Sequence, residues 1–146
     1  MPFDGNAEHL TGISTINVEA LRQLRRVVEA AGRRSFLERR RARLHMSVWY
    51  EERQRWWGLA APQIRACAIT LAAGDEWFTT RGFERSFYRL PTSGPLIGSA
   101  AIEDFFGLSV WNAAWLISRT RSSRRPAPEV IARIDRLIEM AQGAAE

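Results

Sequence analysis

The chain has 146 residues, of which 46% are hydrophobic and 25% charged, an ordinary composition for one globular domain that buries a core. Six tryptophans, seven phenylalanines and two tyrosines exclude a chain that is disordered throughout. The formal net charge of +5 favours anionic partners such as nucleic acid, an anionic membrane surface or an acidic protein.

Cysteine content and hydropathy indicate the compartment. The single cysteine, Cys67, cannot form an internal disulfide, which fits a reducing environment. The N-terminus lacks a basic start followed by an apolar stretch, and the longest uncharged runs are too short or too polar to span a bilayer. We therefore expect a cytoplasmic protein without a transmembrane segment.

The first predicted helix follows residues 1–15, which show no apolar period and which we expect to form a loose arm. Asn17 is a suitable N-cap, and Gly32 is a suitable end. Between them the apolar residues recur at helical spacing: Val18, Leu21, Leu24 and Val28. The sequence predicts a helix over residues 17–32.

Two further segments are interpreted as helices on weaker patterns. Residues 35–44 form a basic stretch with few apolar positions, which we interpret as a short helix. Ser47 resembles another N-cap, two glutamates follow it near the positive end of the helix dipole, and Gly58 closes the segment. Trp49 and Trp56 are seven residues apart, which places them on one face of this second helix.

The middle of the chain combines a clear helical pattern with an ambiguous one. Pro62 suits a first helical turn, and it precedes a stripe at i, i+3, i+4 and i+7 that comprises Ile64, Cys67, Ala68 and Leu71. Residues 76–90 are compatible with helical or irregular structure, which we favour, and also with a short hairpin around residues 81–82. Residues 91–98 contain two prolines and two glycines, which predict a loop.

The last third predicts three helices. Ser99 caps a short helix, Gly107 turns the chain, and Ser109 caps a second helix that ends near residue 118. Residues 119–128 form a basic linker. Pro128 opens a final helix with a wide apolar stripe that comprises Val130, Ile131, Ile134, Leu137 and Ile138.

The predicted fold class is therefore all-α. We expect a single domain over residues 16–143, built as a small orthogonal bundle of five to seven helices, with room for one short β-hairpin. The sequence shows no internal repeat.

All 21 basic residues are arginines, and ten of them form two clusters. Arginine is better suited than lysine to bidentate contacts with phosphate or carboxylate, although a GC-rich genome would produce the same bias. Within residues 33–43 the only acid is Glu38, so an anionic partner would relieve repulsion between like charges. Solvated helix faces are the alternative. The predicted anion- or partner-binding residues are Arg33, Arg34, Arg39, Arg40, Arg41 and Arg43 in the first cluster, and Arg119, Arg121, Arg124 and Arg125 in the second.

The pair of predicted helices over residues 99–118 resembles a helix-turn-helix DNA-binding unit. Such units have a glycine in the turn and apolar residues at fixed offsets from it, which are occupied here by Ile102, Phe106, Leu108, Ala113 and Leu116. Glu103, however, stands where a small residue is usual, and tryptophans stand where base-reading side chains are expected. DNA binding and the ordinary packing of a helical hairpin both remain open.

Trp111 and Trp115 are neighbours at i and i+4 in the same segment. If their helix is buried on all sides, they belong to the core. If they are exposed, they form an aromatic anchor for a protein partner, because tryptophan and arginine dominate interface energetics.

Catalytic and metal-binding signals are weak. His45 and Cys67 lack any local signature of a nucleophile and its base, and Cys67 lies on an apolar stripe that indicates a core position. Two histidines and one cysteine do not complete a typical structural zinc site, and no phosphate-binding glycine loop occurs. We expect no cofactor and no metal.

Several short motifs, in a fixed order, resemble a group of small, uncharacterised bacterial and phage-associated helical proteins. They comprise residues 17–21, 45–49, 67–68, 106–109 with Ala113 and Leu116, and the helix 128–138. The resemblance implies a helical fold and no known activity.

The sequence therefore favours a non-enzymatic binding module that contacts an acidic protein or a nucleic acid through its arginine-rich surface. One alternative is a DNA-binding regulator that uses residues 99–118. Another is an enzyme of unrecognised type that uses His45, Cys67 or the carboxylates. A homo-oligomer also remains open.

Overall fold

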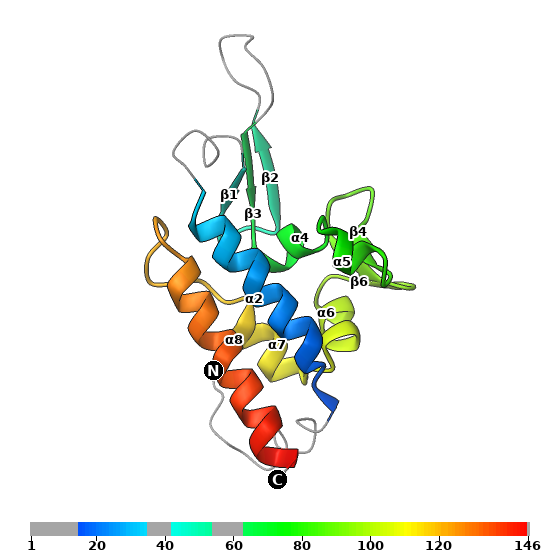
Figure 1. Ribbon diagram of the computed structural model, residues 1–146. Helices are drawn as coiled ribbons and strands as arrows, with labels where there is room; N and C mark the ends of the chain where they lie inside the picture. Colours follow the sequence, from blue (N-terminus) through cyan, green and yellow to red (C-terminus); the bar gives the residue numbers. More distant parts are fainter. Residues whose placement is uncertain (1–14, 35–41, 54–62, 146) are drawn as a thin grey trace.

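The computed structural model describes residues 15–34, 42–53 and 63–145, which form six helices and six strands (Figure 1). Two long helices, α2 (Val18–Gly32) and α8 (Ala127–Ala145), lie side by side and antiparallel. Asn17 caps α2 as predicted, because its side chain accepts a hydrogen bond from the Ala20 amide at 3.0 Å. The prediction of both helices is confirmed.

A three-stranded sheet lies at the end of the molecule where α2 terminates. It comprises β1 (Ala42–Leu44), β2 (Tyr50–Arg53) and β3 (Gln63–Ala66). The central strand is β3, which runs parallel to β1 and antiparallel to β2. The helix predicted over 47–58 is therefore wrong for residues 50–53, and the one predicted over 35–44 is wrong for residues 42–44. Residues 35–41 and 54–62 lie outside the described part of the chain.

The predicted helix that starts at Pro62 is shorter than expected. Its first four described residues form β3, and only α4 (Ala68–Ala72) is helical. Ile64 therefore lies in a strand, whereas the side chains of Cys67, Ala68 and Leu71 are buried as a helical stripe predicts. The helical spacing of the apolar residues continued across a strand–helix junction by coincidence.

A second three-stranded sheet occupies the segment of greatest ambiguity. Helix α5 (Glu76–Thr79) precedes an antiparallel meander of β4 (Phe83–Arg85), β5 (Pro91–Ser93) and β6 (Leu96–Ile97). The hairpin turn is the loop 86–90, and not residues 81–82, and the loop predicted over 91–98 contains two strands. Proline is compatible with β5 because it is the first residue of the strand.

Helices α6 (Ser99–Phe106) and α7 (Val110–Leu116) form the predicted helical hairpin. Gly107 ends α6 in the left-handed conformation, with φ of 65°, and the Ser109 side chain caps α7 by accepting from the Asn112 amide at 3.1 Å. The cap of α6 is Gly98, one residue before the predicted Ser99.

The all-α prediction is contradicted by these two sheets. Each strand has only two to four residues, which is too short for alternation of apolar and polar side chains to emerge. The strands are stabilised instead by pairing with a neighbouring strand. Glu51 on β2, for example, stands opposite Arg65 on β3, a cross-strand pair of opposite charges.

One hydrophobic core connects the helices with both sheets. Four phenylalanines form its aromatic part, with ring centroids 4.7 to 5.8 Å apart: Phe78, Phe83, Phe105 and Phe106. The α2–α8 interface contributes Leu21, Leu24, Val28, Val130, Ile134 and Leu137, all fully buried. Among the described residues, no helix is both long enough and apolar enough to cross a membrane.

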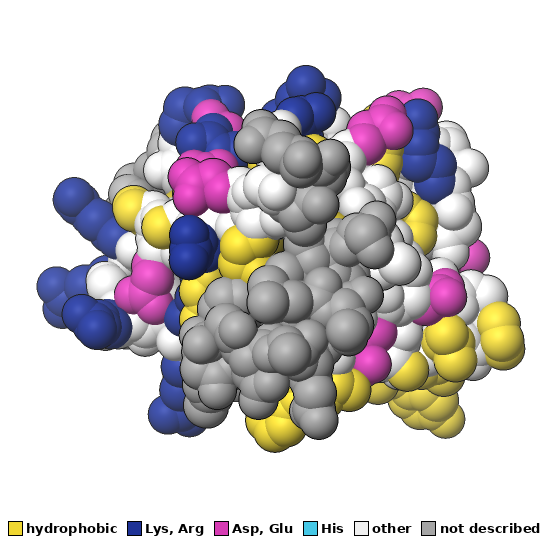
Figure 2. Space-filling view, turned by 90° about the horizontal axis from the view of Figure 1, so that it is seen from below, with side chains coloured by type: hydrophobic (Ala, Val, Ile, Leu, Met, Phe, Trp, Pro, Cys, Tyr) yellow, Lys and Arg dark blue, Asp and Glu magenta, His cyan; other side chains and the backbone are white. Residues whose placement is uncertain are grey.

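Charged and apolar side chains are unevenly distributed over the surface. In Figure 2, dark blue side chains project at the left edge, on the side where the segment leading into α8 lies in Figure 1. Hydrophobic side chains are most numerous at the lower right edge, on the side of the sheet β4-β5-β6. Exposed hydrophobic residues of that sheet and its loop are Phe87, Tyr88, Leu96 and Ile97.

Candidate anion-binding site

A pocket of about 510 Å³ lies where the end of α2, strand β1 and the start of α8 meet. Five arginines line it, namely Arg33, Arg34, Arg43, Arg124 and Arg125. Its apolar lining comprises Ala31, Leu44, Pro126, Ala127, Pro128 and Ile131. The pocket thus combines residues from both of the arginine clusters predicted from the sequence.

Antiparallel packing of α2 and α8 brings the two clusters together. A Cβ at Gly32 would lie 3.0 Å from the Cβ of Ala127, so the end of α2 and the start of α8 are in close contact. Further along the pair, Arg25 donates to Asp135 at 2.8 Å. Arg33 and Arg124, which are 91 positions apart in the sequence, consequently line one cavity.

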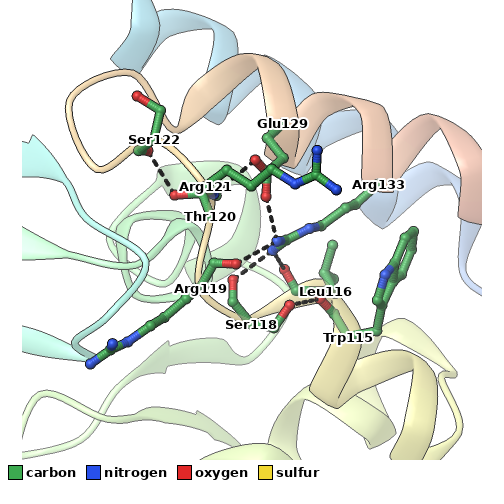
Figure 3. Close-up of polar contacts among 9 residues, drawn as sticks. All are labelled: Trp115, Leu116, Ser118, Arg119, Thr120, Arg121, Ser122, Glu129 and Arg133. Atoms are coloured by element: carbon green, nitrogen blue, oxygen red, sulfur yellow. Dashed lines mark hydrogen bonds and ion pairs between the residues drawn. The ribbon is translucent and has the colours of Figure 1, made fainter. Parts of the chain in front are cut away.

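The segment between α7 and α8 is held in place by the buried side chain of Arg133 (Figure 3). Its guanidinium donates to the carbonyl oxygens of Leu116, Ser118 and Arg119 at 3.3, 2.6 and 2.8 Å. It also forms an ion pair with Glu129 at 2.8 Å. Burial lowers the pKa of Arg133, while Glu129 raises it. Arg133 therefore caps the end of α7 and connects it to the first turns of α8.

Local hydrogen bonds shape the same segment as it approaches the pocket. The Arg121 amide donates to Glu129 at 2.9 Å, and the Arg125 amide donates to the Ser122 hydroxyl at 3.1 Å. The Thr120 hydroxyl donates to the Ser122 carbonyl at 2.9 Å (Figure 3). These bonds form a turn that presents Arg124 and Arg125, both exposed, at the rim.

Arg43 and Arg33 both contact protein groups beside the pocket. Arg43 donates to the Ser123 carbonyl at 3.0 Å, which connects β1 to the segment leading into α8. Arg33 lies 3.6 Å from Glu29, which also pairs with Arg25. Among the lining residues that the structure describes, Glu29 is the single acid, so the five arginines and Glu29 have a formal excess of four positive charges.

Only some of the predicted site residues line the same pocket in the structure. Arg33, Arg34, Arg43, Arg124 and Arg125 converge on the pocket, whereas Arg119 and Arg121 are absent from its lining. The backbone groups of Arg119 and Arg121 bond to Arg133 and Glu129. Arg39, Arg40 and Arg41 lie outside the described residues.

A histidine stands close to the pocket and is surrounded by arginines. Partial burial lowers the pKa of His45, and the charges of Arg65, Arg43 and Arg119 lower it further, against a smaller opposing effect of Glu51. The ring nitrogen Nδ1 lies 2.7 Å from the Ser47 hydroxyl. His45 is therefore neutral at pH 7 and adds no positive charge to that of the neighbouring arginines.

The cysteine and the histidine have different surroundings. Cys67 is buried, burial raises the pKa of its thiol, and its Sγ lies 3.3 Å from the Thr70 hydroxyl. The structure thus places Cys67 in the core, while His45 contacts Ser47. Within the described ranges, no group of three His, Cys, Asp or Glu side chains is arranged to hold a metal ion.

Helix α7 presents an apolar outer surface. Val110 and Trp111 are exposed, Trp111 by 52%, and Trp115 is half-buried against the core. Asn112, a polar residue of the same helix, is only 1% exposed. This surface suits a protein contact better than the base edges of DNA, which require hydrogen-bonding side chains.

Sequence reasoning missed the apolar half of the pocket and the role of Arg133. Leu44, Pro128 and Ile131 were not distinguishable from ordinary core or linker residues, because only the packing of α2 against α8 places them beside arginines. Arg133 did carry a signal: it lies within the apolar stripe of α8, between Val130 and Ile134. A charged residue on a buried face indicates a structural bonding role.

No protein family, no curated protein and no solved structure matches the chain. The resemblance to bacterial and phage-associated helical proteins stays a prediction.

Proposed function

We propose that this protein is a non-enzymatic binding module that captures an anionic partner in the arginine-lined pocket. The observation that carries the proposal is the convergence of Arg33, Arg34, Arg43, Arg124 and Arg125 on one cavity. On a solvated charged face, arginines would be expected to spread apart, because separation in solvent screens like charges most effectively.

The arrangement favours a bound anion for an energetic reason. The guanidinium groups that line this concave surface repel one another, and Glu29 is the one acid among the lining residues that the structure describes. A phosphate or carboxylate in the pocket would accept several charge-assisted hydrogen bonds at once. The segment that carries Arg124 and Arg125 is already held by Arg133 and Ser122, so binding requires little ordering of its backbone.

Two charge-matched triple variants test this proposal. The pocket variant Arg33→Gln/Arg124→Gln/Arg125→Gln and the control Arg22→Gln/Arg26→Gln/Arg136→Gln each remove three exposed arginines. Each variant therefore has a net charge of +5 − 3 = +2. We expect the pocket variant to bind fluorescent single-stranded DNA and polyglutamate at least about tenfold more weakly than the control, because charge-assisted hydrogen bonds are lost.

The measurement is fluorescence anisotropy at two salt concentrations, since electrostatic affinity falls with salt. Circular dichroism of both variants checks that they remain folded. If both variants lose affinity equally, net charge alone explains binding and the pocket has no special role.

A further inference from the structure

We infer that the ligand of the pocket is the di- or triphosphate group of a nucleotide, either free or at the 5′ end of a nucleic-acid strand. This inference rests on the proposed function and specifies its ligand. It follows from the charge, the size and the mixed chemistry of the cavity.

The charge of the pocket matches a polyphosphate. The described residues of its lining, five arginines and Glu29, have a formal excess of four positive charges. A carboxylate or an internal phosphodiester carries one negative charge, whereas a nucleoside triphosphate concentrates about four charges on one chain of three phosphates. A single carboxylate would leave most of the pocket repulsion in place.

The arginines approach the cavity from different sides, which suits several phosphates better than one. Arg33 comes from the end of α2, Arg43 from β1, and Arg124 from the segment before α8. Each guanidinium offers a planar pair of donors that fits phosphate oxygens. Arg43 is held by the Ser123 carbonyl at 3.0 Å, and this contact fixes its position beside the segment that carries Arg124.

The helix dipole at the start of α8 adds a small attraction, although Pro128, the second residue of the helix, has no amide hydrogen to donate. The first amides of a helix have no partner within the helix and carry partial positive charge. The pocket includes Ala127, the first residue of this 19-residue helix. The carbonyl end of α2 opposes this effect from the other side, so the guanidinium groups supply most of the attraction.

The size of the pocket fits a nucleotide. Its volume of about 510 Å³ lies within the range of small-molecule sites, about 300 to 1,000 Å³. Apolar surface is available next to the arginines, from exposed Pro128 and half-buried Ile131. A nucleoside attached to the phosphates can contact this surface, whereas inorganic phosphate would leave it uncovered.

The experiment uses one RNA sequence of about twelve nucleotides with three different 5′ ends, at about 100 mM salt and with a chelator to keep divalent cations from the phosphates. The full-length protein binds 3′-labelled strands that carry a 5′-triphosphate, a 5′-monophosphate or a 5′-hydroxyl. We expect the triphosphate strand to bind at least about tenfold more tightly than the hydroxyl strand. The preference should disappear in Arg33→Gln/Arg124→Gln/Arg125→Gln and persist in Arg22→Gln/Arg26→Gln/Arg136→Gln.

Competition with ATP then distinguishes the two sources of the polyphosphate. If ATP displaces the strand at concentrations at which pyrophosphate displaces less of it, the ligand is the free nucleotide. If the strand stays bound, the ligand is the 5′ end of a strand. Equal binding of the triphosphate and hydroxyl strands overturns this inference and leaves the proposed function standing. Failure of every strand and of polyglutamate to bind overturns the proposed function itself.

Discussion

At the scale of residues, arginines of this protein serve two different purposes. Arg33, Arg124 and Arg125 are exposed and line the pocket. Arg133 and Arg85, in contrast, point at the carbonyl groups of helices. Arg85 donates to the Thr70 carbonyl at 2.9 Å, and burial lowers its pKa. Arginines that satisfy carbonyl groups in this way stabilise the fold and are not available to a partner.

Replacing Arg133 tests this division. Arg133→Met should lower the free energy of unfolding by about 3 kcal/mol, because three carbonyl groups and Glu129 lose a charged donor. The same change at exposed Arg136 on the same helix should shift it by less than about 0.5 kcal/mol. Urea denaturation of both variants measures the difference. Equal effects at the two positions would show that the buried bonds of Arg133 contribute nothing.

At the scale of elements, the turn between α6 and α7 determines how the first helix begins. The Asn17 amide donates to the Phe106 carbonyl at 2.8 Å, and the Asn17 side chain donates to the Phe105 carbonyl at 3.3 Å. The end of α6 thus bonds to the start of α2. Gly107 permits this contact because it has no side chain: the backbone of Thr15 occupies the space that a Cβ at position 107 would need.

We expect a severe effect of a side chain at Gly107. Gly107→Ala adds a Cβ that would lie 1.9 Å from the Thr15 carbonyl oxygen, at a φ of +65°. Gly94 also has positive φ, +57°, but the described residues leave open space around it. Gly94→Ala should therefore cost only about 1 kcal/mol for the left-handed conformation, and Gly107→Ala at least about 3 kcal/mol. Thermal unfolding of both variants separates the two costs, and a Gly107→Ala variant no less stable than Gly94→Ala would refute the close approach.

At the scale of the whole molecule, the positive field of the arginines reaches His45. Arg65, Arg43 and Arg119 all disfavour the charged imidazole, although partial burial is the largest cause of its lowered pKa. Glu51 acts in the opposite direction. Because Arg43 also lines the pocket, protonation of His45 is electrostatically connected to the candidate site.

The pH dependence of stability follows from the lowered pKa. An unfolded chain protonates His45 near pH 6.5, whereas the folded protein does so only at lower pH. The stability that His45 contributes is therefore complete above pH 6.5 and is lost as the pH falls through the folded pKa. We therefore expect that, as the pH falls from 8 to 5, the free energy of unfolding of His45→Gln rises relative to that of the natural chain.

The measurement is urea denaturation of both proteins at the two pH values. The difference between the two proteins at each pH cancels the contribution of the carboxylates, which titrate in both. Two-dimensional NMR of the imidazole, assigned with the variant, should show His45 titrating below pH 6.5. An unchanged stability difference across this range would contradict the proposed environment of His45.

The amino-acid sequence by itself determined the long helices. Asn17, Ser109 and Gly107 act through hydrogen bonds and backbone angles that involve near neighbours in the chain, so their roles are visible without a fold. The apolar stripes of α2 and α8 extend over four turns or more, which is long enough for a period of 3.6 residues to be recognised.

Only the tertiary structure decided the sheets and the pocket. Strands as short as Phe83–Arg85 exist because a partner strand completes their hydrogen bonds, and no local pattern encodes that partner. The sequence shows two arginine clusters and does not show that they meet. They meet because Gly32 contacts Ala127, and this contact depends on the packing of two apolar helix faces that lie about a hundred positions apart in the sequence. Burial of apolar surface between the two helices stabilises this packing, and the packing places arginines from two separate basic segments around one cavity.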